Sequence, residues 1–199
     1  MAVFDFDADY TLENEVVQLR PLNSSDLTKL LPFALNEPEL WTYSMISAAG
    51  EDGMTNYVEQ AIAERESHKQ YPFIVYDKRV GHYAGCTRYY DIQLSGQTLQ
   101  LGYTWYGNQF QRTGLNRHCK YLLLQFAFEY MNMQRVEFRA DNDNHRSIAA
   151  MKAIGCHEEG ILRSNGKRPD GSRRDSIVLS ILRDEWLNSV KASLNNKIY

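Results

Sequence analysis

The sequence predicts an α+β fold built on one mixed α/β sheet that carries helices on both faces. Three segments in the middle of the chain, residues 71–77, 80–92 and 99–107, are rich in aromatic and β-branched residues. Short polar turns separate them, so they are interpreted as consecutive antiparallel strands. Strand–helix–strand patterns follow as far as residue 183. Antiparallel strands joined to such units imply a single mixed sheet.

One strand and two helices are expected before that sheet. Residues 16–22 form a strand pattern that a proline ends. Ser24 or Ser25 can cap a helix that starts at Asp26, because a side-chain oxygen can accept a hydrogen bond from the first helical turn. A second helix fits residues 54–66.

A helix of about 18 residues is expected from Gly114 onward. Its apolar side chains recur with a period near 3.6, at Leu115, Cys119, Leu122, Leu123, Phe126 and Tyr130. The remaining expected elements are a strand at 135–140, a helix at 144–155 ended by Gly155, strands at 156–164 and 173–183, and a last helix near Asp184. The whole chain, residues 1–199, is expected to be one domain with a core at about 15–187, an N-terminal arm at 1–14 and a C-terminal tail at 188–199.

Composition and charge exclude several classes of function. The chain has 199 residues, 43% apolar and 24% charged, with a formal net charge of −3. This balance is typical of a globular protein and gives no reason to expect nucleic-acid binding, which needs a basic face. The one dense basic segment, residues 163–174, is interpreted as a solvated turn. Nucleic-acid binding through that segment is the weakest alternative.

The distribution of apolar residues and cysteines bears on the compartment. No apolar run approaches the roughly 20 residues that a membrane-spanning helix needs, and the acidic N-terminus does not resemble a signal peptide. The three cysteines are far apart, and no cysteine or histidine spacing indicates a metal site. We therefore expect a cytoplasmic protein with no metal and no membrane partner.

The polar stretch at residues 107–119 joins a strand to a helix that begins beside Gly114. Backbone N–H groups at a helix start lack intrahelical partners, and the helix dipole is positive there, so a diphosphate fits. Gly114 permits a close approach because it has no Cβ, and Arg112 can add positive charge. The stretch is neither a nucleotide P-loop nor a dinucleotide fingerprint. Taken alone, it equally fits an ordinary helix start.

The ordered motifs of the chain resemble the GNAT acetyltransferase superfamily. The letters "QRTGLN" resemble its Gln/Arg-x-x-Gly-x-Gly/Ala signature, with Gln111 first, Gly114 fourth and Asn116 in the sixth place. About 30 residues later, "NHRSIAAMKAIGCHEEG" resembles the second conserved segment, with Asn144 as its asparagine and Gly155 as its glycine. The flanking segments "LRPLNSSDL" and "EEGILR", with the C-terminal "SIVLSILRDEW", are similar to the RimJ/RimL-like branch.

The resemblance implies a fold and a cofactor. It implies a mostly antiparallel sheet with one splayed parallel pair, at residues 99–107 and 135–140, between which the pantetheine arm of acetyl-CoA inserts. The backbone of Thr104, Trp105 and Tyr106 would pair with the pantetheine, and Asn144 would hold that arm. The amides of Arg112, Thr113, Gly114, Leu115 and Asn116, after Gln111, would hold the pyrophosphate.

The resemblance also implies the reaction, a direct attack of a primary amine on the acetyl thioester in a ternary complex. The backbone N–H of Trp105 or Tyr106 would meet the developing oxyanion. Many relatives place an acidic tyrosine where this chain has Met151, whereas the RimJ/RimL-like branch uses a serine that Ser147 matches. Ser147 can instead be a first-turn helix residue. The base stays open among Glu137, Asp141, His82, His145 and a water chain.

The aromatic residues of the early loop and central strands offer an acceptor pocket. Such rings suit a cationic amine, although core packing explains them equally well. The candidates are Trp41, Tyr43, Tyr83 and Tyr103. The acceptor can be a protein N-terminus or a small-molecule amine, and a homodimer is compatible with the resemblance. The competing function is a CoA-binding regulatory protein with little or no catalysis, because the tyrosine is missing and no base is evident.

Overall fold

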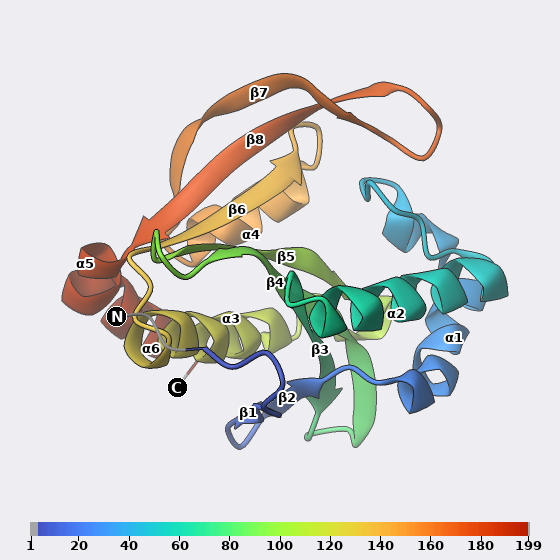
Figure 1. Cartoon of the computed structure of the whole chain (residues 1–199), viewed down its shortest axis with the longest axis horizontal. Coiled ribbons are helices and arrows are strands. Elements are labelled where there is room, and N and C mark those ends of the chain that lie inside the picture. The colour runs from blue at the N-terminus through green and yellow to red at the C-terminus, as the bar shows by residue number, and fades with distance from the viewer. Residues whose placement is uncertain (1–3, 199) are drawn as a thin grey trace.

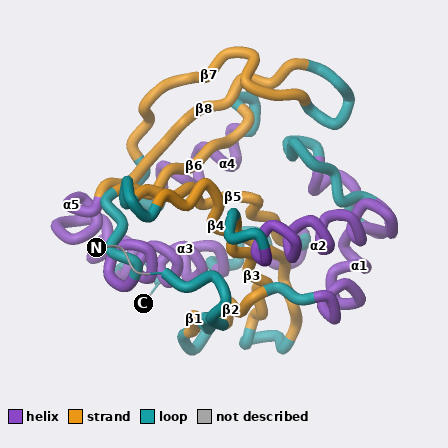
Figure 2. Tube along the Cα trace, in the orientation of Figure 1, coloured by secondary structure: helices purple, strands orange, loops and turns teal. Residues whose placement is uncertain are grey.

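The computed structural model describes residues 4–198. Its single sheet has eight strands in the order β1-β2-β3-β4-β5-β6-β8-β7. The strands are β1 (Leu12–Glu13), β2 (Val17–Pro21), β3 (Gln70–Asp77), β4 (His82–Gln93), β5 (Thr98–Tyr106), β6 (Arg135–Asp141), β7 (His157–Lys167) and β8 (Arg173–Leu182). The helices are α1 (Leu27–Asn36), α2 (Gly50–Glu66), α3 (Leu115–Gln125), α4 (His145–Ala153), α5 (Arg183–Glu185) and α6 (Lys191–Asn195). Figure 1 and Figure 2 show these elements arranged around the sheet.

One pair of neighbouring strands is parallel, and its ladder is short. β5 and β6 pair from Thr98 opposite Arg135 to Gln100 opposite Glu137. Beyond Gln100, the rest of β5 and the rest of β6 have no mutual pairing, while each keeps its antiparallel partner on the other side. The sheet is therefore mixed, as the sequence predicted, and it opens between the C-terminal parts of β5 and β6.

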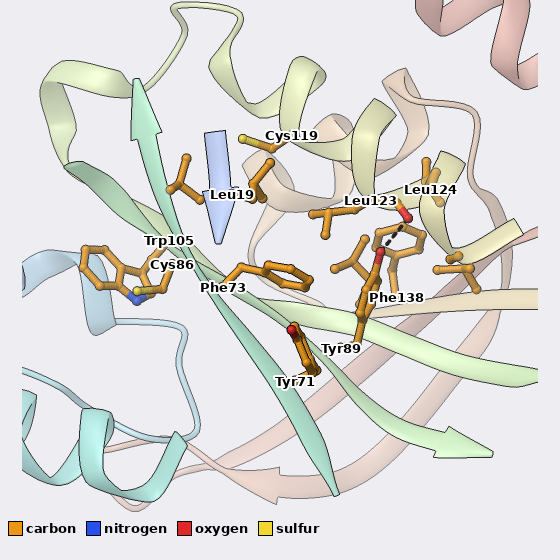
Figure 3. Packing of buried hydrophobic residues seen from close by; sticks show 14 of the residues in the cluster. Leu19, Tyr71, Phe73, Cys86, Tyr89, Trp105, Cys119, Leu123, Leu124 and Phe138 are labelled. Carbon is orange, nitrogen blue, oxygen red and sulfur yellow. Dashed lines mark hydrogen bonds between the residues drawn. The ribbon is translucent and has the colours of Figure 1, made fainter. Parts of the chain in front are cut away.

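Helices cover both faces of the sheet, and the side chains of the central strands divide between them. Figure 3 shows Phe73, Tyr89 and Phe138 on the side of α3, and Tyr89 donates a hydrogen bond to the Leu123 carbonyl over 2.6 Å. Trp105 points to the opposite side, where its ring packs edge-on against Trp41 with centroids 4.9 Å apart. The two faces thus form one core on either side of β4 and β5.

Both ends of the described chain contribute to this core. Phe4 and Phe6, in the segment expected to be an arm, are 8% and 9% exposed, and Phe4 packs edge-on against Tyr71. Val190 and Leu194, in the expected tail, are 7% and 1% exposed. Burial of these apolar side chains attaches both segments to the domain.

Three helix boundaries differ from the sequence expectation. The cap of the first helical turn is Asn23, not a serine, because its Oδ1 accepts from Ser25 N while the Asp26 side chain accepts from Asn23 N, completing a capping box. α2 begins at Gly50, four residues before the expected start. α3 continues as a π-helical turn at Phe126–Tyr130, which shifts the apolar stripe and leaves Tyr130 54% exposed.

Candidate active site

A bulge in β5 lies beside the opening between β5 and β6. Cys86 of β4 is opposite Trp105, but Arg88 is opposite Gly102, so β5 carries one extra residue there. Tyr103, within the bulge, has a φ of +50°, which is uncommon for a residue with a side chain. A Cβ on Gly85 would come within 2.1 Å of the Trp105 carbonyl oxygen, so β4 needs glycine where β5 bends against it.

The segment after β5 leads to the start of α3 through a left-handed turn. Gly114, the N-cap residue of α3, has a φ of +88°, and a Cβ there would meet nothing within 4 Å. Arg112 also has a positive φ, of +63°. The open space in front of Gly114 faces the positive end of the helix dipole, so an anion can approach the backbone closely.

Gln111 fastens this turn to two other elements. Its Nε2 donates to the Tyr106 carbonyl over 2.8 Å, and its Oε1 accepts from Arg146 Nη1 over 2.6 Å. Arg146 belongs to α4, so Gln111 connects the end of β5 with the helix that follows β6. On the other side of the turn, Arg79 donates to the Thr113 carbonyl over 3.0 Å. These bonds hold the helix start in place before any ligand binds.

A pocket of about 340 Å³ lies next to the turn. Its lining residues come from the β3–β4 hairpin and from the segment before α3: Asp77, Arg79, Val80, His82, Gln109, Phe110 and Thr113. Asp77 is nearly fully buried and forms a close ion pair with Arg79. The pocket therefore has a neutralised charge pair at one wall and the helix start at the other.

Asn116 turns its side chain towards β5. Its Oδ1 accepts a hydrogen bond from the Tyr106 hydroxyl over 3.3 Å. Burial raises the pKa of Tyr106 well above its ordinary value, and the adjacent Cys119 adds to the rise, so this hydroxyl stays a neutral donor. The side chain that replaces the usual small residue is thus directed to a partner within the protein.

Asn144 and Ser147 meet at the start of α4, beyond the end of β6. Asn144 is the N-cap residue, and its Oδ1 accepts from the Ser147 backbone N–H over 3.0 Å. Both side chains are half-buried. The geometry satisfies the local capping role and also places the Ser147 hydroxyl near the carboxyl end of β6.

Both candidate carboxylates of β6 are held by arginines. Asp141 accepts from Arg168 Nε over 2.6 Å and from Arg168 Nη2 over 2.8 Å, and these bonds hold the pKa of Asp141 below its ordinary value. Glu137 accepts from Arg135 over 2.8 Å and from Arg139 over 2.6 Å. A carboxylate in such a pair is a weak base. His82 and His145 are exposed on the surface.

A buried lysine that the sequence reasoning missed reaches the strand opening from α3. Lys120 is 5% exposed, its Nζ donates to Thr104 Oγ1 over 2.8 Å, and it lies 5.9 Å from the centroid of the Phe138 ring. Thr104 belongs to β5 and Phe138 to β6, so the ammonium group lies between the two strands. Burial lowers the pKa of Lys120 to about 8, although Cys119 and Cys156 oppose the drop.

The comparison with known proteins decides the family. A family model described as the acetyltransferase (GNAT) domain matches residues 17–157. The chain belongs to the GNAT acetyltransferase family. An acetyltransferase structure from T. thermophilus, so described provisionally, shares 30% identity and a TM-score of 0.87, with 100% of each chain covered. The resemblance stated from the motifs, and the fold that it implied, are therefore confirmed.

Two further relatives belong to the ribosomal and RimJ group. YdaF of Bacillus subtilis (strain 168), provisionally named a ribosomal N-acetyltransferase, is 24% identical over 180 residues, covering 87% of this chain and 94% of its own. Mycobacterium smegmatis RimJ, solved in complex with CoA-disulfide, has a TM-score of 0.80 at 19% identity, covering 94% of this chain and 93% of its own. The likeness to RimJ concerns the fold. With the family established, this chain is an acetyl-CoA-dependent N-acetyltransferase.

The four aromatic residues predicted to line an acceptor pocket of this GNAT enzyme do not come together. Trp41 packs on Trp105, within the core. Tyr83 lies beneath Lys29, whose Nζ is 4.6 Å from its ring centroid. Tyr103 lies beneath Arg88, whose Cζ is 4.2 Å from its centroid. Tyr43 is 40% exposed, and its carbonyl accepts from Arg174 Nη1 over 3.2 Å. Protein cations therefore already occupy the rings of Tyr83 and Tyr103.

The cysteines of this GNAT domain are unsuited to covalent chemistry. Cys86, Cys119 and Cys156 are free and buried. Burial raises the pKa of Cys119 and of Cys156 to about 12. Among residues 4–198, no group of His, Cys, Asp and Glu is arranged to hold a metal ion. Within the same range, no helix has the length and apolar character to cross a membrane.

Proposed function

We propose that this enzyme transfers an acetyl group from acetyl-CoA to a primary amine by direct attack in a ternary complex. The observation that carries the proposal is the opening between β5 and β6, which leads to the open helix start at Gly114. Unpaired strand edges can hydrogen-bond an extended chain, and a helix start can bind a diphosphate. An acyl-CoA carries both groups in sequence. CoA bound to M. smegmatis RimJ supports the same reading.

The donor would be held by backbone groups more than by side chains. In the proposal, the backbone of Thr104, Trp105 and Tyr106 pairs with the pantetheine amides. The N–H groups of residues 112–116 surround the pyrophosphate, and the space at Gly114 accommodates it. Asn144 Oδ1 is engaged with Ser147 N, so its contribution to the pantetheine is made through the Nδ2 donor. Bound acetyl-CoA supplies the activated acetyl group as a thioester.

Three roles fall to residues near the opening. A backbone N–H at Trp105 or Tyr106 polarises the acetyl carbonyl, because the bulge in β5 turns the backbone there away from a regular ladder. Ser147 donates a hydrogen bond to the departing sulfur. Because the carboxylates of Glu137 and Asp141 are ion-paired, the acceptor proton leaves through water.

The test is incubation with acetyl-CoA and a panel of amines, with free thiol and acetylated product both measured. The panel contains protein N-terminal peptides, amino acids, polyamines and aminoglycosides. The proposal expects at least one amine to raise thiol release above the rate of acetyl-CoA hydrolysis. CoA binding measured by calorimetry, together with no turnover on any amine, would support the second candidate function below.

The second candidate is a CoA-binding regulatory protein. It is favoured by the buried methionine Met151, 7% exposed, at the place of the acidic tyrosine in many relatives. In either case we propose a single domain over the whole chain and a cytoplasmic location. The ribosomal names of its relatives make a protein N-terminus the first acceptor to try.

A further inference from the structure

Arg88 of β4 is a buried arginine without a carboxylate partner. The residue is 2% exposed. Its Nη1 donates to Gln70 Oε1 over 2.9 Å, and this is its one hydrogen bond to residues 4–198. Its Nε is buried and unsatisfied. A buried guanidinium normally needs hydrogen-bond partners on all sides, because desolvation of an unpaired charge is costly.

The unsatisfied part of Arg88 is a defined edge of the guanidinium group. Nη1 is taken by Gln70, so the edge formed by Nε and Nη2 has no partner in the described chain. Two parallel N–H donors on that edge match the two oxygens of a carboxylate. The rings of Tyr57 and Tyr103 lie against the guanidinium, with centroids 4.7 Å and 4.2 Å from Cζ. A planar group approaching in the plane of the guanidinium therefore fits better than a bulky one.

The surroundings of Arg88 are donors rather than counterions. The indole nitrogens of Trp41 and Trp105 and the hydroxyl of Tyr57 are also buried and unsatisfied. The three rings form one cluster, with centroids 4.9 to 6.4 Å apart. Burial raises the pKa of Tyr57, although the Arg88 charge opposes the rise, so Tyr57 stays neutral. A cluster of donors with one cation lacks an acceptor oxygen.

A second buried arginine approaches the same region from β8. Arg174 is 6% exposed, and it donates to Ser176 Oγ over 3.1 Å and to the Tyr43 carbonyl over 3.2 Å. It lies within electrostatic range of Tyr103, the ring beneath Arg88. The nearby Asp141 already has both oxygens bonded by Arg168. The face of the sheet opposite α3 therefore has excess positive charge beside the bulge.

We propose that the unpaired edge of Arg88 binds a carboxylate of the amine acceptor, so that the substrates of this enzyme are amines that also carry a carboxylate. The inference rests on the proposed acetyl transfer and specifies its substrate class. The half-buried Tyr103 forms the entrance, and Arg174 adds long-range attraction for the anion. The carboxylate can belong to a free amino acid or to an acidic side chain near a peptide N-terminus.

The experiment compares matched acceptors with and without the carboxylate. Free amino acids are measured against their amides, and peptides beginning with Asp or Glu against the same peptides with Asn or Gln. Binding of each to the enzyme saturated with CoA, which has no acetyl group to transfer, is measured by calorimetry. Thiol release with acetyl-CoA is measured in parallel. We expect the acids to bind at least about tenfold more tightly, because an unpaired buried donor pair penalises the amide.

Arg88→Gln tests the residue itself. The acid is expected to lose about tenfold or more in affinity, whereas the amide and CoA change little. Arg65→Gln is the matched control, since Arg65 also lies over a tyrosine ring, with its Cζ 4.7 Å from the Tyr71 centroid, but near the N-terminal segment. If Arg88→Gln fails to fold, the comparison of acids with amides in the unaltered enzyme still decides.

Two results would overturn the inference: equal binding of acids and amides, or no binding of either to the CoA complex. A preference for free amino acids, or for acidic peptides, would identify which source supplies the carboxylate. Failure of acetyl transfer as such has a different signature. In that case no acceptor raises thiol release, while the calorimetric preference for acids can still be present.

Discussion

Lys120 donates a hydrogen bond from Nζ to Thr104 Oγ1 over 2.8 Å, and this bond joins α3 to β5 at the strand opening. Thr104 Oγ1 is also 2.8 Å from Thr87 Oγ1, so three elements meet at one buried polar contact. A buried ammonium group reduces stability unless it is compensated. Its position between β5 and β6 leads to the first prediction.

Lys120→Met is expected to stabilise the protein at pH 7. The Lys120 pKa falls from 10.5 to about 8 on folding, which corresponds to a destabilisation of roughly 3 kcal/mol below pH 8. Between pH 8 and 10.5 the unfolded chain binds more protons than the folded one, so this penalty decreases as pH rises. The advantage of the variant should therefore shrink across that window, as urea unfolding at several pH values would reveal. A pH-independent difference would contradict it.

Gly114→Asp is expected to weaken CoA binding severely, because a carboxylate would face the diphosphate. The backbone there has a φ of +88°, so any side chain adds strain. Gly114→Asn is the matched control, since asparagine has the same shape, is neutral and tolerates this conformation. Calorimetry should show a loss of at least about tenfold for Asp relative to Asn. Equal affinities would remove the diphosphate from this place.

Ser147→Ala is expected to lower kcat while leaving CoA affinity nearly unchanged. The Ser147 backbone N–H, not its hydroxyl, bonds Asn144, so the cap survives the substitution. A loss in kcat of roughly tenfold to hundredfold is the expected order for one lost proton donor. Asn144→Ala, which removes the cap itself, is the comparison variant and should reduce stability by about 1 kcal/mol. Unchanged turnover in Ser147→Ala would exclude the hydroxyl from catalysis.

Asp26→Asn is expected to destabilise the fold by about 3 to 5 kcal/mol at neutral pH, because it leaves Arg20 without its partner. Burial alone would raise the pKa of Asp26, but hydrogen bonds from Arg20, Lys29 and the Asn23 backbone outweigh it and lower the pKa. The stabilisation is thus present above about pH 4 and is lost as pH falls through the lowered value. Unfolding measured from about pH 7 to about pH 3 should show the variant and the parent converging.

The order of the elements could be predicted from the sequence because each follows from local periodicity and turn residues. The alternation at residues 71–107 predicted β3, β4 and β5 closely. The end of α3 could not be predicted, because the π-helical turn at Phe126–Tyr130 depends on how the helix packs. Asn23 was missed as the cap because its choice over two adjacent serines depends on the reciprocal bond with Asp26.

What the sequence determined by itself is the pair of local motifs around Gly114 and Asn144, each tied to a backbone conformation that neighbouring residues enforce. Those motifs led to the family. The tertiary structure decided the environment of the charged residues: Lys120 lies between two strands, and Arg88 is buried without a counterion. Burial and pairing depend on side chains brought together from distant parts of the chain, so local patterns carry no record of them.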